Sequence, residues 1–159
     1  MSVAELVKGC PLFHEIYDNE VEEILSSCVV ASYEKNDAII NQGDTSSDIC
    51  ILLAGTAGIY VNKDGHRHFI TDIGSGDLFG ELVLINETER TADIVAKERC
   101  DVLIISYEDF YSFYHKRPKV FALMVLNVTR LITKRLKGSN SIIEGLNTKL
   151  RSLEEKKAA

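Results

Sequence analysis

Short apolar and β-branched runs, separated by Gly, Asn and Asp, fill the sequence from Val29 to Ser106. The runs are VVASY, AII, DICILLAGTAGIYV, HRHFITDI, ADIVA and DVLIIS. Runs of this kind are typical of β-strands, and strands so numerous and evenly spaced favour an antiparallel barrel or jelly roll over a parallel sheet with crossover helices. Asp64-Gly65, between two of the runs, strongly predicts a β-hairpin because glycine tolerates positive φ.

Helical patterns stand on both sides of these strands. The segment NEVEEILSSC begins at Asn19, a favourable capping residue, and places Val21 and Ile24 on one helical face. After the strands, YEDFYSFYHKR predicts a helix that stops at Pro118, a residue favoured in the first turn of the next helix. The sequence therefore predicts a mainly β fold with flanking helices: a double-stranded β-helix or jelly-roll barrel, short N-terminal helices and a long C-terminal helix.

The last part of the chain predicts one long helix with a regular apolar spacing. Residues at 3-4 spacing form this pattern: Ala122, Val125, Thr129, Ile132, Leu136, Ser139, Ile143, Leu146, Leu150 and Leu153. Such a spacing is typical of a coiled-coil seam, so we expect a homodimer. The interruption around Gly138 and Asn140 leaves open an amphipathic helix folded back on its own domain. We expect a barrel domain with N-terminal helices at 1–117 and a dimerisation helix at 118–159.

Charge and composition narrow the possible partners. The formal net charge is −6 at pH 7, so the field of the protein repels polyanions, and we expect no direct nucleic-acid partner. No apolar run is long enough to span a bilayer, and the first residues, MSVAELVKGCPLF, lack the pattern of a secretory signal. We therefore expect a cytoplasmic protein that does not contact a membrane.

The sequence carries no motif of the common catalytic or metal sites. The four cysteines, Cys10, Cys28, Cys50 and Cys100, are widely separated, without CxxC or a Cys/His cluster at zinc spacing. We expect them to be buried or half-buried thiols. A nucleophile elbow, a P-loop, an HExxH motif and a pair of catalytic carboxylates are all missing. We therefore expect no enzyme, no catalytic residue, no metal and no cofactor.

The segment DLFGELVLINETERTADI has the residues of an anion site. A short helical turn beginning near Glu81 would direct several backbone N–H groups the same way, and helix starts of this kind bind phosphate. These groups belong to Gly80, Leu82 and Val83. Gly80 allows close approach of the ligand, and Arg90 can hold two phosphate oxygens with its planar guanidinium. Glu81 only accepts hydrogen bonds, so a sugar hydroxyl suits it, and together these residues predict a pocket for phosphate and ribose.

The same residues carry a resemblance to a known family. FGELVLINETERTA is similar to the phosphate-binding cassette of the cyclic nucleotide-binding domain family, which usually reads F-G-E-[LI]-[AGC]-L and, further on, R-[TSA]-A. The resemblance covers most of the chain, because CPLF, the glycine-punctuated strands, GSGDLFGE and the closing helices follow in the family's order. It implies that Gly80 and Glu81 contact the ribose, that the Leu82 and Val83 amides meet the cyclic phosphate, and that Arg90 neutralises it.

The resemblance implies further contacts with the ligand. Thr91 would add a hydroxyl contact, and it is compatible with either cAMP or cGMP. In the catabolite activator branch of the family, polar residues of the long helix touch the base across the dimer. By position along the helix, Ser139 and Asn140 would fall near that point.

Four residues depart from the family's pattern. Val83 stands where a small residue is usual, and Glu87, Glu89 and Asp93 stand where related sequences often have neutral residues. A carboxylate close to a phosphate in a half-wet site would oppose binding by about 1–3 kcal/mol. We therefore expect reduced affinity for a cyclic nucleotide.

Two functions are compatible with these observations. The first is a regulatory domain that senses cAMP or cGMP and signals to a separate protein partner by repositioning its C-terminal helices. The second is a dimeric scaffold or interaction protein that keeps the fold and binds no nucleotide. At the site itself, the alternative is that Glu81 and Arg90 form only a surface ion pair. Family members that regulate transcription continue into a helix-turn-helix module, and we expect no such DNA reader here because only a short segment follows.

Overall fold

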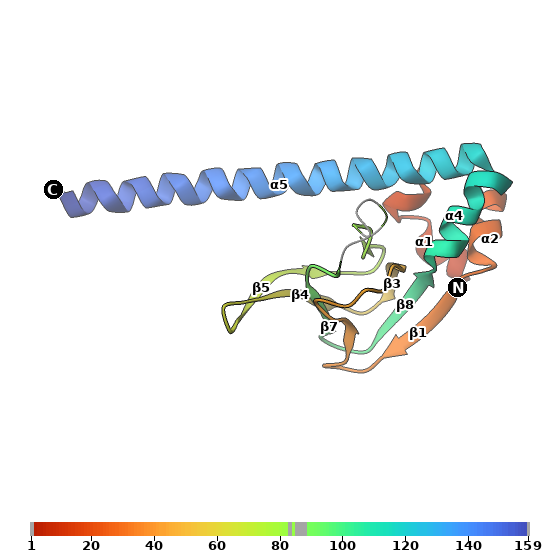
Figure 1. Cartoon of the computed structure of the whole chain (residues 1–159), viewed down its shortest axis with the longest axis horizontal. Coiled ribbons are helices and arrows are strands. Elements are labelled where there is room, and N and C mark those ends of the chain that lie inside the picture. Colours follow the sequence, from red (N-terminus) through yellow and green to blue (C-terminus); the bar gives the residue numbers. More distant parts are fainter. Residues whose placement is uncertain (1, 83, 85–88, 159) are drawn as a thin grey trace.

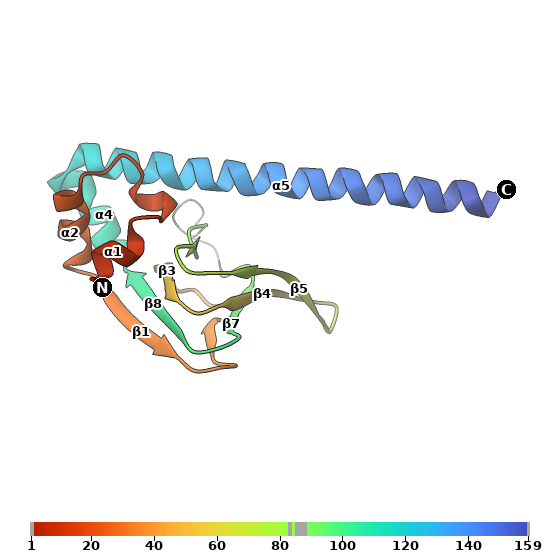
Figure 2. The same ribbon diagram turned by 180° about the vertical axis from the view of Figure 1, so that it is seen from behind.

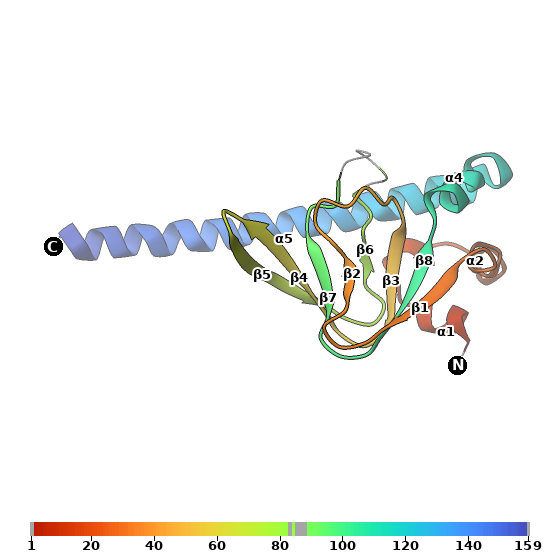
Figure 3. The same ribbon diagram turned by 60° about the horizontal axis from the view of Figure 1, so that its bottom comes forward.

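Two four-stranded antiparallel sheets form the body of the protein in the computed structural model, which describes residues 2–82, 84 and 89–158 (Figure 1). One sheet has the order β1-β8-β3-β6 and the other β2-β7-β4-β5. The strands are β1 (Val29–Tyr33), β2 (Ala38–Ile40), β3 (Ile49–Ala54), β4 (Ala57–Lys63), β5 (His66–Ile73), β6 (Leu78–Phe79), β7 (Asp93–Ala96) and β8 (Cys100–Ile105). The sheets curve around a common interior (Figure 3), which confirms the predicted mainly β barrel.

Helices flank the barrel, as predicted. They are α1 (Val3–Val7), the 3-10 helix η1 (Pro11–Phe13), α2 (Asp18–Leu25), α4 (Tyr107–Lys116) and α5 (Pro118–Ala158). The expectation that α2 starts with Asn19 as its cap is wrong, because the helix begins at Asp18. The Glu20 carboxylate accepts a hydrogen bond from the Tyr17 N–H, at 3.2 Å, and so satisfies a donor before the first turn.

The core consists of two apolar clusters on the two faces of β3. Ile49 and Ile51 face the helices, whereas Cys50 and Leu52 face the barrel interior. Successive side chains of a strand point to opposite faces, so a strand covered on both sides must be apolar throughout. This arrangement explains why ICILL is an unbroken apolar run.

The β4–β5 hairpin turns at the predicted dipeptide. Asp64 has φ 52° and Gly65 has φ 77°, so both residues adopt the left-handed conformation of a type I′ turn. The hairpin reaches away from the barrel in the direction that α5 takes (Figures 1 and 2). The hairpin prediction is confirmed.

The four cysteines are free thiols, as expected. Cys10, Cys50 and Cys100 are buried and Cys28 is half-buried. Burial raises the pKa of Cys10 to about 11 and that of Cys50 to about 12. Both thiols therefore stay protonated at neutral pH and act as small apolar side chains.

Helix α5 is continuous through Gly138 and has two different halves. In the first half, Val120, Met124 and Val128 are buried, and Ile132 packs against the same core. In the described second half the large apolar side chains are more than half exposed: Leu136, Ile142, Ile143, Leu146, Leu150 and Leu153. The first half of α5 is therefore folded onto its own domain, as the alternative supposed, whereas the second half extends beyond the barrel (Figure 1). The division at residue 118 and the dimer stay predictions.

No helix among the described residues has a stretch apolar enough, over a sufficient length, to cross a membrane.

We expect Gly55→Ala to lower the free energy of unfolding by about 2–4 kcal/mol. Gly55 has φ +92°, and a β-carbon there would meet the Arg99 carbonyl oxygen and lie 2.9 Å from Cys100 Sγ. Urea denaturation measures the change. The control is Gly138→Ala, because a β-carbon at that helical position meets nothing within 4 Å, and alanine favours helices. Equal stability of the two variants would show that the turn at Gly55 is not constrained as described.

Candidate ligand site

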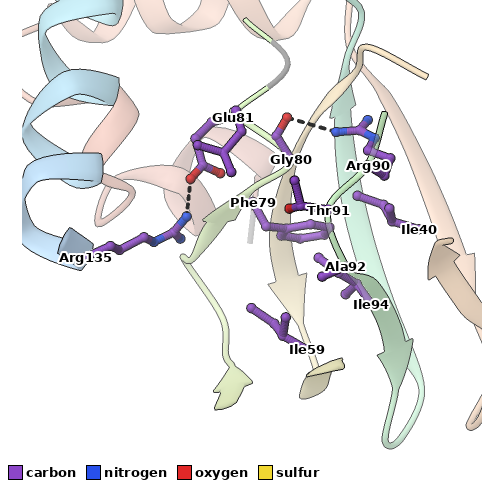
Figure 4. A pocket seen from close by; sticks show the side chains of 11 residues that line it. Ile40, Ile59, Phe79, Gly80, Glu81, Arg90, Thr91, Ala92, Ile94 and Arg135 are labelled. Atoms are coloured by element: carbon purple, nitrogen blue, oxygen red, sulfur yellow. Dashed lines mark hydrogen bonds and ion pairs between the residues drawn. The ribbon is translucent and has the colours of Figure 1, made fainter. Parts of the chain in front are cut away.

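A cavity of about 120 Å³ lies between the barrel and α5. Its lining consists of Ile40, Ile59, Phe79, Gly80, Glu81, Leu82, Arg90, Thr91, Ala92, Ile94 and Arg135 (Figure 4). Five of the predicted site residues are therefore brought together: Gly80, Glu81, Leu82, Arg90 and Thr91. Val83 lies outside the described residues. Ser139 and Asn140 are exposed on α5 and do not line this cavity, and their contact across a dimer stays a prediction.

Gly80 is required by the close packing at the cavity wall. Its φ is +77°, and a β-carbon there would lie 2.7 Å from Arg90 Nη1 and 3.1 Å from the Asp48 carbonyl oxygen. Any other residue would be strained in this conformation and would push the arginine aside. The glycine thus allows the guanidinium to lie directly against the backbone, as Figure 4 shows.

Arg90 is held at the cavity by protein groups. Its side chain is buried, and it donates from Nε to Ser46 Oγ at 3.0 Å, from Nη1 to Gly80 O at 2.9 Å and from Nη2 to Asp48 O at 2.6 Å. Its backbone N–H also donates to Asp44 O, at 2.7 Å. Arg90 lies in the segment before β7 and not on the strand itself. A guanidinium fixed in this way is preorganised to meet an anion.

Glu81 pairs with an arginine that the sequence analysis did not identify. Glu81 is 3% exposed, and its carboxylate accepts a hydrogen bond from Arg135 of α5 (Figure 4). Arg135 also donates to the Leu78 carbonyl oxygen. The alternative in which Glu81 and Arg90 form only a surface ion pair is wrong, because both are buried and each has other partners. The one feature of the sequence that could have indicated Arg135 is its position directly before Leu136, which places a positive charge beside the apolar seam.

The Asp93 carboxylate does not line the cavity, although we expected it close to the phosphate. Its carboxylate accepts hydrogen bonds from the Gln42 N–H and from Asn62 Nδ2, each at 2.7 Å, and lies 3.4 Å from Arg67 Nη2. The Gln42 N–H lowers the pKa of Asp93, and Asn62 and Arg67 lower it further. Its neighbour Ile94 lines the cavity, so Asp93 points to the other face of the strand.

Glu87 and Glu89 are the other two acidic residues that depart from the family pattern. Glu89 is exposed and does not line the cavity, so the structure gives it no direct opposition to a ligand there. Glu87 lies outside the described residues.

The cavity combines three kinds of surface. Arg90 supplies positive charge, Glu81 supplies a buried acceptor, and apolar side chains including Ile40, Ile59 and Phe79 supply the floor. A ligand complementary to it has an anionic group, a hydroxyl group and an apolar face.

Comparisons with known proteins show the family to which the chain is similar. A family model described as "Cyclic nucleotide-binding domain" matches residues 30–117. The chain is 30% identical over 132 residues to the cyclic AMP receptor protein of Thermus thermophilus, covering 82% of this chain and 59% of that protein. It is 32% identical over 91 residues to a cAMP-dependent protein kinase regulatory subunit of Mycosarcoma maydis, covering 57% of this chain and 17% of that one.

The fold agrees as well. The crystal structure of the Thermus thermophilus catabolite activator protein superposes with a TM-score of 0.75 at 28% identity, covering 86% of this chain and 63% of that one. The chain thus spans less than two thirds of the length of these relatives. With the family model covering more than half of its residues, this chain belongs to the cyclic nucleotide-binding domain family.

Proposed function

We propose that the cavity binds a cyclic nucleotide, cAMP or cGMP, and that the protein is a regulatory sensor and not an enzyme. The observation that carries the proposal is the buried pair of complementary groups in one cavity, Arg90 and Glu81. The relatives named for cAMP support it. The absence of membrane and nucleic-acid partners and the cytoplasmic location stay predictions.

Each predicted site residue has a role in this proposal. Arg90 neutralises the cyclic phosphate, and the backbone amides of Leu82 and Val83 donate to it. Gly80 and Glu81 contact the ribose, whose hydroxyl donates to the carboxylate. Thr91 adds a hydroxyl, and Ser139 and Asn140 approach the base from the partner helix of a homodimer.

Arg135 connects the cavity to the helix that carries the signal. Glu81 accepts from Arg135, and a ribose hydroxyl would be a second donor to the same carboxylate. Ligand binding would therefore change one of the contacts between α5 and the barrel. A shift of α5 would then present a different surface to a separate protein partner, by selecting one of two helix positions.

The second candidate is a scaffold that binds no nucleotide. It is favoured by the hydrogen bonds that Arg90 and Glu81 already make with Ser46, Asp48 and Arg135, because these satisfy both side chains without a ligand. Thermal denaturation of refolded protein distinguishes the two. A cyclic nucleotide that binds the native state raises the melting temperature. At 100 times its Kd it raises the free energy of unfolding by about 2.7 kcal/mol. An unchanged melting temperature with both cAMP and cGMP supports the scaffold.

We expect Glu81→Gln to weaken cyclic nucleotide binding by about 5- to 30-fold, which corresponds to about 1–2 kcal/mol. The amide keeps an oxygen for the ribose hydroxyl but loses the charge and the ion pair with Arg135. Calorimetry gives both affinities. The control is Glu89→Gln, an exposed residue outside the cavity lining, which should bind as the wild type does. Unchanged affinity in Glu81→Gln would remove Glu81 from the ligand site.

A further inference from the structure

The first part of α5 has a charge opposite to that of the whole chain. From residue 118 to 143 it carries Lys119, Arg130, Lys134, Arg135 and Lys137 and no Asp or Glu, although the formal net charge of the chain is −6. Arg135 is engaged with Glu81. Arg130, Lys134 and Lys137 are spaced by four and three residues, so they lie on one face of the helix.

A second cavity, of about 500 Å³, lies beneath this basic face. We call it the basic groove; its lining is Lys8, Gly9, Cys10, Pro11, His14, Asn127, Arg130, Leu131 and Lys134. It lies between the N-terminal segment and α5, which pass close to each other in Figure 2. The groove shares no lining residue with the nucleotide cavity.

A buried amide fixes the two walls of the groove relative to each other. Asn127 is 2% exposed, and its Nδ2 donates to Leu12 O at 3.0 Å and to His14 O at 2.7 Å. Its Oδ1 accepts from Arg130 Nη1 at 3.0 Å. The amide thus ties α5 to the segment around η1 and holds one guanidinium at the groove.

The cations of the groove are available to an incoming carboxylate. Lys8 Nζ lies 3.5 Å from Asp18 Oδ2, and Arg130 Nη1 lies 3.6 Å from Glu15 Oε1. The side chains of both pairs are 47% to 80% exposed, so the pairs are weak and exchangeable. In the part of the chain that the structure describes, Lys134 has no carboxylate within 4.0 Å.

We propose that the basic groove binds an acidic segment of a partner protein in which apolar side chains alternate with carboxylates. The carboxylates would pair with Lys8, Arg130 and Lys134, and the apolar side chains would pack on Pro11 and Leu131. A short acidic segment fits better than nucleic acid because the net charge of −6 repels a long polyanion, whereas the groove attracts a few charges locally. The inference names the class of partner for the proposed sensor, but binding in the groove does not require a nucleotide.

Fluorescence anisotropy of the full chain tests the proposal without nucleotide, using a labelled peptide of alternating Glu and Leu residues. We expect saturable binding that weakens as salt is added. Lys134→Glu should weaken it at least about tenfold, because it replaces attraction by repulsion at the groove. The control is Lys149→Glu, which makes the same change of charge on an exposed part of α5 outside the groove and should bind like the wild type.

Three results would overturn the proposal. They are absence of peptide binding at low salt, equal losses in Lys134→Glu and Lys149→Glu, and preferential binding of inorganic polyphosphate or duplex DNA that depends on Lys134. A Leu-free peptide of Glu and Gly should bind more weakly, and equal binding would contradict the apolar part of the groove. Failure of nucleotide titration leaves these results unchanged, so the two proposals fail separately.

Discussion

Replacing Arg90 with alanine is expected to weaken cyclic nucleotide binding by about 30-fold to several thousandfold, which corresponds to about 2–5 kcal/mol. In the proposed site the variant would lose a charge-assisted, bidentate contact with the cyclic phosphate, at a position where the guanidinium is buried. The variant also leaves the Asp48 and Gly80 carbonyl groups without a donor, so it should be less stable by about 1–3 kcal/mol. Affinity is measured by calorimetry at a temperature where circular dichroism shows the variant folded.

The matched control is Arg99→Ala, which removes the same charge from an exposed position outside the cavity. It should bind the nucleotide as the wild type does. The order of the losses should be Arg90→Ala, then Glu81→Gln, then Arg99→Ala. If wild-type protein binds a cyclic nucleotide and Arg90→Ala binds it equally well, the ligand site lies elsewhere.

A second large effect is expected at the seam of α5, where Leu136→Asp should convert a dimer into a monomer. The second half of the helix exposes Leu136, Ile143, Leu146 and Leu150, and an apolar stripe of this length is costly to leave in water. An aspartate within a helix pair would bury an unpaired charge. We therefore expect the dimer dissociation constant to rise by about 100-fold or more, as measured by light scattering over a dilution series.

The control for this variant is Ser141→Asp. Ser141 is exposed on α5 and lies about half a turn of the helix away from the seam, so the same charge there should leave the dimer intact. A wild-type protein that is monomeric at tens of micromolar would contradict the seam, and an equal loss in both variants would show only that added negative charge separates the chains.

Local patterns were sufficient to predict most of the fold. The hairpin at Asp64-Gly65 was predictable because a type I′ turn needs two left-handed residues in succession. The strands were predictable because each apolar run is short and bounded by turn residues. The cap of α2 was not, because Asn19 is a good capping residue, yet the helix begins at Asp18 and Glu20 satisfies the Tyr17 N–H.

Contacts between distant parts of the chain limited the prediction of the site. Glu81 and Arg135 are 54 residues apart, and only the packing of α5 against the barrel brings them together. Ser46 and Asp48 hold Arg90 from 44 and 42 residues away. The expected position of Asp93 was wrong for a different reason. Asp93 is close to Arg90 along the sequence, but strand alternation turns its carboxylate to Gln42.

Isothermal titration calorimetry of the refolded wild-type protein with cAMP, cGMP and non-cyclic AMP tests whether the cavity is a cyclic nucleotide site. Denaturing and refolding first removes any nucleotide that is carried through purification. We predict saturable binding of cAMP or cGMP with one nucleotide per chain, and much weaker binding of non-cyclic AMP. The absence of binding heat at several temperatures for both cyclic nucleotides at millimolar concentration, with protein that is folded by circular dichroism, would contradict the proposal and leave the scaffold function in its place.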